Sequence, residues 1–171
     1  MKRQSALYGC IAFGRGASYM SGMYGDLYHG RVLELAAEMP HVGHLSDPDG
    51  AATKVSRICG STVTVELKVK DGKISDFAID PKACALGQAA ASVLAQNIIG
   101  ATAEEVREAR DALRKMLKEE GPPPEGRFWE LRHLEAVREF PPRHLSTMLA
   151  FEAAVAALEQ AGALPASTAA G

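Results

Sequence analysis

Two cysteines stand at positions where a thiol can do chemistry. Cys59 precedes Gly60 at a turn between two predicted strands, and Cys84 lies in the first turn of a helix that Asp80 and Pro81 are expected to begin. The unpaired amides and positive dipole at a helix N-terminus favour the thiolate, the form of cysteine that binds metals. The two thiols stand 25 residues apart, which matches no zinc knuckle. The spacing leaves two alternatives open, a functional pair at one edge of a sheet or two small buried side chains.

Other motifs add little to this pair. The chain has no phosphate-binding loop, no dinucleotide-binding glycine pattern, no serine-hydrolase elbow and no HExxH metal motif. His144 follows Pro141 and Pro142 at the start of the last predicted helix, so it is either a polar helix-start residue or a further ligand. The third cysteine, Cys10, stands apart in the N-terminal segment.

Length and charge exclude several classes of protein. The 171 residues predict one domain. With 19 Lys and Arg against 21 Asp and Glu, the net charge of −2 excludes a strongly basic nucleic-acid binder. Three scattered cysteines form no disulfide framework and indicate a reducing, cytoplasmic compartment. The longest apolar stretches are too short and broken to span a membrane.

The elements that must position the cysteines begin with a β-hairpin. Apolar and polar residues alternate strictly over 62–70, which is typical of a strand with one buried face. Asp71-Gly72 is a favourable hairpin turn, and Lys73–Ile79 is the predicted partner strand. A third strand is expected over Lys54–Ile58 on the other side of Cys59. These patterns predict an antiparallel sheet of about three strands.

Helices are expected before and after this sheet. Thr102 and Glu105 form a capping-box pattern. The predicted helices are 26–38, 81–99, 103–120, 128–137 and 143–160. The second of these begins with small residues almost throughout, so it should lie tight against the sheet or a loop. We therefore expect an α+β fold in which the small antiparallel sheet packs against four to five helices. Residues 1–23 are predicted to form a basic N-terminal extension, and 162–171 a disordered tail.

The order of these parts resembles the NifU/IscU/SufU family of iron–sulfur cluster assembly scaffolds. The resemblance runs from about Tyr24 to Leu158 and predicts a NifU/IscU-like domain over 24–161. It is carried by blocks that agree with the family in order and spacing: Leu27-Tyr28-His29, Pro40–Gly43, Ile58–Ser61, Ala83–Ser92, Gly100–Thr102 and Glu139–Phe151.

The resemblance also implies a ligand set, which is incomplete in this chain. The family binds its nascent cluster, or a zinc ion, through three cysteines and an aspartate. Cys59 and Cys84 match two of the cysteines, whereas Ser61 stands for the aspartate and Ser146 for the third cysteine. A serine hydroxyl is a weak ligand because its pKa lies far above neutrality. His144 or a donor outside the domain would therefore have to help complete the site.

Two functions follow from the resemblance. In the first, the protein is a scaffold or carrier, not an enzyme. It holds a transient iron–sulfur cluster on Cys59 and Cys84, exchanges with a cysteine desulfurase and apo-protein clients, and has zinc as a less favoured cargo. In the second, the fold has lost its site and serves as an interaction module. It would then be an accessory subunit of a larger complex, peripheral to a membrane if that complex is membrane-bound. The 23-residue extension is long enough to wrap a partner.

Overall fold

The sheet has three antiparallel strands in the order β1-β2-β3, as expected from the sequence. The computed structural model describes residues 25–166. The strands are β1 (Gly50–Val55), β2 (Thr62–Lys70) and β3 (Lys73–Lys82). Asp71 and Gly72 make the predicted tight turn between β2 and β3, with φ values of 53° and 74°.

The helices follow the predicted order. They are α2 (Gly30–Ala37), α3 (Ala85–Asn97), α4 (Ala103–Lys118), the 3₁₀ helix η1 (Gly126–Glu139) and α5 (Pro141–Gln160). Residues 25–27 are also helical. The capping box of α4 is present, because the Thr102 hydroxyl accepts from the Glu105 amide while the Glu105 carboxylate accepts from the Thr102 amide. The α+β prediction is confirmed.

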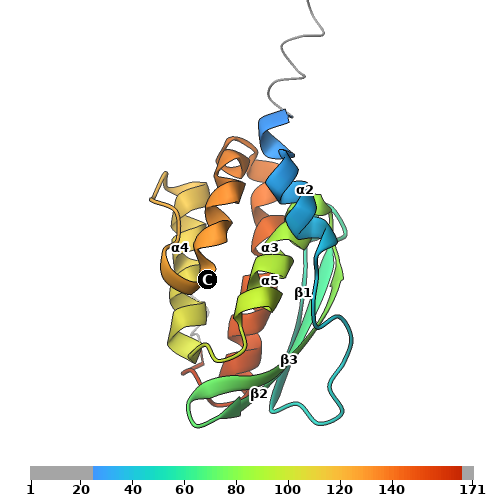
Figure 1. Cartoon of the computed structure of the whole chain (residues 1–171), viewed down its shortest axis with the longest axis vertical. Coiled ribbons are helices and arrows are strands. Elements are labelled where there is room, and N and C mark those ends of the chain that lie inside the picture. The colour runs from blue at the N-terminus through green and yellow to red at the C-terminus, as the bar shows by residue number, and fades with distance from the viewer. Residues whose placement is uncertain (1–24, 167–171) are drawn as a thin grey trace, which may run out of the picture.

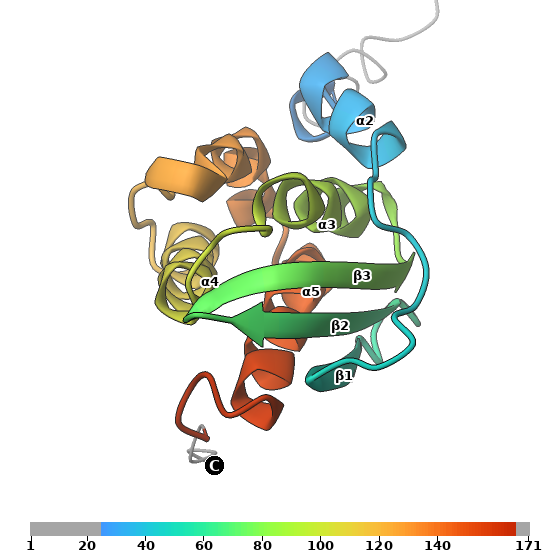
Figure 2. The ribbon, with the colours of Figure 1, turned by 60° about the horizontal axis from the view of Figure 1, so that its bottom comes forward.

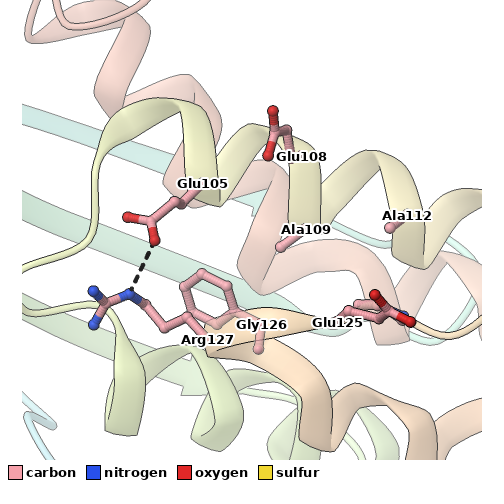
Figure 3. Close-up of a pocket in the computed structure, with 9 residues that line it drawn as sticks. Glu105, Glu108, Ala109, Ala112, Glu125, Gly126 and Arg127 are labelled. Carbon is pink, nitrogen blue, oxygen red and sulfur yellow. Dashed lines mark ion pairs between the residues drawn. The ribbon is translucent and has the colours of Figure 1, made fainter.

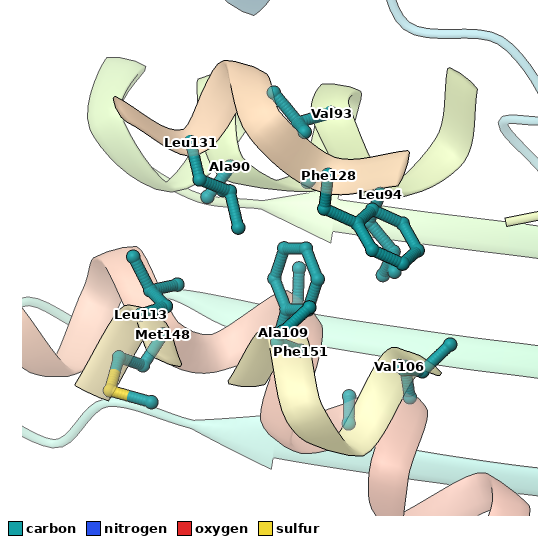
Figure 4. Close-up of a cluster of buried hydrophobic side chains, with 14 of the residues drawn as sticks. Ala90, Val93, Leu94, Val106, Ala109, Leu113, Phe128, Leu131, Met148 and Phe151 are labelled. Atoms are coloured by element: carbon teal, nitrogen blue, oxygen red, sulfur yellow. The ribbon is translucent and has the colours of Figure 1, made fainter. Parts of the chain in front are cut away.

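The molecule has the sheet on one side and the helices on the other (Figure 1). The long helix α5 packs against β1 and β2, and α3 packs against both α5 and β3. A view from another side shows α2 lying outside α3 (Figure 2). Buried apolar side chains from α3, α4, η1 and α5 form the centre of the core (Figure 4). There the Phe128 and Phe151 rings pack edge to face, with their centroids 5.5 Å apart.

The predicted helix start at Asp80-Pro81 is wrong. Both residues belong to β3, where Asp80 pairs with Thr64 and Pro81 pairs with Val63. β3 is an edge strand, and an edge tolerates a proline because one side of the strand has no ladder bond to form. Helix α3 therefore begins at Ala85, with Cys84 as its N-cap residue.

Two other elements also differ from their predicted bounds or type. β1 is Gly50–Val55 instead of the predicted Lys54–Ile58. A Cβ at Gly50 would lie 2.0 Å from the Ala157 carbonyl oxygen, so this strand begins at a glycine because α5 lies directly on it. The predicted helix over 128–137 is a longer 3₁₀ helix with a kink at Phe128.

The two ends of the chain lie mainly outside the described residues. The predicted extension, 1–23, falls wholly outside them, as does the last part of the predicted tail. The described part of that tail includes Leu164, which is buried against the core. None of the helices in the described range is long and apolar enough to cross a membrane.

Candidate functional site

A closed turn presents Cys59 to solvent. The turn joins β1 to β2, and two backbone hydrogen bonds of 2.8 Å fasten it: Ser56 N–H donates to Ser61 O, and Gly60 N–H donates to Ser56 O. Gly60 has a φ of 70°, a conformation that glycine adopts without strain. The turn leaves Cys59 exposed while Ser56 and Ser61 are buried beneath it.

Serine hydroxyls surround the Cys59 sulfur. Its Sγ lies 3.0 Å from Ser61 Oγ and 3.3 Å from Ser56 Oγ. Partial burial works to raise the pKa of this thiol, but hydrogen bonding with the Ser56 and Ser61 side chains and with the Ser61 backbone, together with a smaller contribution from Ser146, outweighs it. These interactions lower the pKa of Cys59 from 9.0 to about 7, so that a large fraction is thiolate at neutral pH.

Cys84 approaches the same place from another part of the fold. It is the N-cap residue of α3 and is partly buried. Its Sγ lies 3.7 Å from Ser146 Oγ on α5, a distance at which a thiol can donate to a hydroxyl. Ser146 is only 1% exposed, and its hydroxyl donates to the Arg143 carbonyl at 3.0 Å. Ser146 is thus a common neighbour of the two cysteines.

The close approach of α3 to α5 makes this arrangement possible. A Cβ at Gly87 would lie 3.0 Å from the Ser146 carbonyl oxygen and 2.9 Å from Ala83 Cβ. The small-residue helix does lie tight against another backbone, but at Gly87 that backbone is helix α5, whereas the sequence predicted the sheet or a loop. Without a side chain at Gly87, α5 can bring Ser146 up to the N-terminus of α3.

The structure thus brings four of the five predicted site residues together: Cys59, Ser61, Cys84 and Ser146. His144 is buried and engaged elsewhere, because its Nε2 lies 3.1 Å from Val137 O and 3.0 Å from Arg138 O. Both of these partners are acceptors, so this nitrogen carries a hydrogen and donates. The ring ties η1 to the start of α5.

Sequence reasoning missed Ser56. Its role depends on the turn that folds it under Cys59, and a serine three residues before a cysteine is too common a pattern to signal that.

Within residues 25–166, no group of three or more His, Cys, Asp and Glu side chains could hold a metal ion. The arrangement offers two thiols, one of them acidified, with hydroxyls as additional weak ligands.

A cavity of about 380 Å³ lies beside Cys59. Its lining is mainly apolar: Leu27, Tyr28, Ile58, Cys59, Phe140, Pro142 and Arg143. Ile58, next to the cysteine, is 69% exposed.

Another hollow, of about 340 Å³, lies between α4 and 124–128 (Figure 3). Glu105 and Arg127 form an ion pair of 3.5 Å there, and neither described cysteine lines it.

Comparison with known proteins identifies the family. The model of the NifU-like N-terminal domain matches residues 27–127. The chain belongs to this family. It is also similar to an iron–sulfur cluster assembly scaffold protein IscU of Thermotoga maritima, with 27% identity over 78% of this chain and 94% of the relative. An IscU of Streptococcus pyogenes is 25% identical over 78% of this chain and 84% of its own length.

Solved structures agree with this assignment. The crystal structure of a nitrogen-fixing NifU-like protein (N-terminal) from Brucella abortus is 53% identical, with a TM-score of 0.81 over 82% of this chain and 97% of that one. A SufU scaffold structure from Fervidobacterium islandicum has a TM-score of 0.72 at 21% identity, over 78% and 98% of the two chains. The second likeness bears on the fold alone. The NifU-like fold expected from the sequence is confirmed.

Proposed function

We propose that this NifU-like domain is an iron–sulfur cluster scaffold or carrier in which Cys59 and Cys84 are the thiolate ligands. The observation that carries this proposal is the meeting of the two cysteines around one hydroxyl, that of Ser146. The cysteines come from separate elements, the β1–β2 turn and the start of α3. Two unrelated cysteines would have no reason to share a buried polar neighbour.

The acidity of Cys59 suits it to receive iron. Metal binding requires the thiolate, and a thiol must lose its proton before it coordinates. With a pKa of about 7, Cys59 carries little of that cost at neutral pH. Its exposure lets an iron and sulfide donor, here a cysteine desulfurase with an iron source, reach the sulfur directly.

The incomplete ligand set suits a cargo that must leave again. A closed structural metal site uses four strong ligands, whereas a site that keeps positions open binds exchangeable groups. Ser61 and Ser146 supply only hydroxyls, so the cluster would depend on further donors and pass readily to the stronger thiolate sets of apo-protein clients. The role is transfer of cargo and involves no catalytic turnover.

Anaerobic reconstitution tests this proposal. The full chain is incubated with iron and sulfide, then desalted and examined by absorption spectroscopy and iron analysis. We expect sulfide-to-iron bands in the wild type, lost in Cys59→Ala and in Cys84→Ala. Ser75→Ala, an exposed serine on β3, is the matched control and should leave the bands unchanged. Circular dichroism verifies that each variant remains folded.

Two other outcomes identify the alternatives. A protein that stays colourless and metal-free but co-purifies with a large complex is an accessory interaction module. In that case the Cys59→Ala and Cys84→Ala variants should still co-purify with the complex, because the interaction does not depend on a bound metal. A protein that retains zinc in elemental analysis, and loses it on substitution of either cysteine, carries zinc on the same two thiolates.

A further inference from the structure

The cavity beside Cys59 has the composition of a small-molecule site. Its volume of about 380 Å³ falls within the range of about 300–1,000 Å³ that is usual for such sites. The lining is apolar except for the Cys59 thiol, the Tyr28 hydroxyl and the Arg143 side chain. Apolar walls with a few polar groups that fix the orientation of the ligand are typical of these sites. A small molecule bound here would lie against an exposed thiol.

The charged side chains around this thiol are cationic. Arg143 lines the cavity, and Arg57 is an exposed residue in the turn that carries Cys59. Within residues 25–166, neither guanidinium lies within ion-pairing distance of a carboxylate. No Asp or Glu lines the cavity or stands in the turn 56–61. A ligand that carries carboxylates would therefore meet guanidinium groups that are free to pair with them.

A second, less accessible thiol lies close to the first. Ser146 Oγ is 3.7 Å from Cys84 Sγ and is also a neighbour of the Cys59 thiol. Cys59 is exposed, whereas Cys84 is partly buried. An exposed thiol meets a dissolved reagent first, and a neighbouring thiol can then attack the bond that has formed. The two cysteines are thus arranged as an attacking and a resolving thiol.

We propose that the cavity beside Cys59 binds a low-molecular-weight disulfide that carries carboxylates, and that Cys59 exchanges thiols with it. The Cys59 thiolate attacks one sulfur of the ligand and forms a mixed disulfide. The S–S bond of the ligand breaks, and its other half leaves as a thiolate that takes up the proton Cys59 has released to solvent. Cys84 then attacks the Cys59 sulfur, gives its proton to the second departing thiolate and closes a Cys59–Cys84 disulfide. Overall, the two cysteines lose two electrons and the ligand is reduced to two thiols.

This exchange goes beyond the proposed scaffold function. It needs no metal, so it depends on the thiols and the cavity alone. The oxidised chain has no free thiol among its described cysteines, and metal binding requires the thiolate. Thiol exchange would therefore stop cargo loading until the disulfide is reduced.

Reaction of the reduced, metal-free full chain with two disulfides of opposite charge tests the proposal. Glutathione disulfide carries carboxylates, whereas cystamine carries amines. Mass spectrometry of the Cys59 peptide gives the rate with each probe, and the ratio of the two rates measures the preference for an anion. We expect Arg143→Gln to lower this ratio about two- to five-fold, as for loss of an exposed ion pair. Arg107→Gln on α4, where Arg107 pairs with Glu104, is the matched control and should leave the ratio unchanged.

Cys84→Ser tests the second step. It should stop at the mixed disulfide of Cys59 with glutathione, whereas the wild type should release glutathione and end as the Cys59–Cys84 disulfide. An unchanged ratio in Arg143→Gln, or a stable Cys59 adduct in both the wild type and Cys84→Ser, would overturn the inference. Because this assay contains no iron, its failure leaves the scaffold function intact, and a failed reconstitution with iron and sulfide leaves the exchange at Cys59 intact.

Discussion

Replacing Ser61 with alanine should make Cys59 a weaker acid. The Ser61 hydroxyl lies 3.0 Å from the Cys59 sulfur, and its hydrogen bond helps hold the pKa of that thiol at about 7. Alanine removes the hydroxyl but retains the backbone amide, which also contributes. We therefore expect the pKa to rise from about 7 part of the way toward 9.0, the ordinary value for the thiol.

The fraction of Cys59 that is ionised at pH 7 sets the scale of the expected change. A thiol with a pKa of about 7 is about half ionised at pH 7, whereas one with a pKa of 9.0 is about 1% ionised. Loss of all the hydrogen bonds to Cys59 would thus lower its thiolate fraction at pH 7 by at least about 50-fold, since burial would then hold the pKa above 9.0. Ser61→Ala should give part of this loss, and adding Ser56→Ala should give more. Thiolate nucleophilicity rises with pKa and offsets part of the change in rate.

For this reason the assay follows the pH dependence and not a single rate. Iodoacetamide alkylation of the Cys59 peptide is measured by mass spectrometry at a series of pH values. The midpoint should lie near 7 in the wild type and higher in Ser61→Ala, with Ser75→Ala as a control that leaves it in place. A wild-type midpoint near 9, or superimposed curves for wild type and Ser61→Ala, would refute this account of how the turn acidifies Cys59.

Three further predictions concern the site and the elements that build it. Ser146→Cys places a third thiol where the Ser146 hydroxyl now lies, 3.7 Å from Cys84 Sγ, and should increase the iron retained after reconstitution and desalting; equal retention would contradict the convergence at Ser146. Gly87→Ala forces α3 away from α5 at a cost of about 1–3 kcal/mol, partly offset by about 1 kcal/mol of helix propensity, so urea unfolding should show a net loss of stability. Thr102→Ala removes the capping box of α4 and should lower the free energy of unfolding by about 0.5–2 kcal/mol in the same assay.

Local sequence signals were sufficient for part of the fold. The alternation over Thr62–Lys70, the turn at Asp71-Gly72 and the capping box at Thr102 each depend on neighbours in the chain, and the structure confirms all three. The dipeptide Asp80-Pro81 misled because its local chemistry suits two structures. It can begin a helix, and it can also end an edge strand, as it does in β3.

Other features depend on contacts between distant segments. Gly50 resembles a loop residue in the sequence, yet it begins β1 because α5 passes directly over it. Ser56 gains its role only when the β1–β2 turn closes with Cys59 above it. The proximity of Cys59 and Cys84 was expected from the order of the parts in the family, because their spacing in the sequence alone had left it open. That Cys59 and Cys84 are the ligands remains a prediction.

The two serines at the site act differently from the residues they are expected to replace. A carboxylate at Ser61 would place a negative charge beside Cys59 and disfavour the thiolate, whereas the hydroxyl donates a hydrogen bond that stabilises it. A thiol at Ser146 would add a strong metal ligand, whereas the hydroxyl serves as a neighbour to both sulfurs. On the proposed function, two serines in place of stronger ligands would weaken cargo binding while the Ser61 hydroxyl favours the Cys59 thiolate. Such a site would accept cargo at neutral pH on two thiolates and pass it readily to a client that offers a stronger thiolate set.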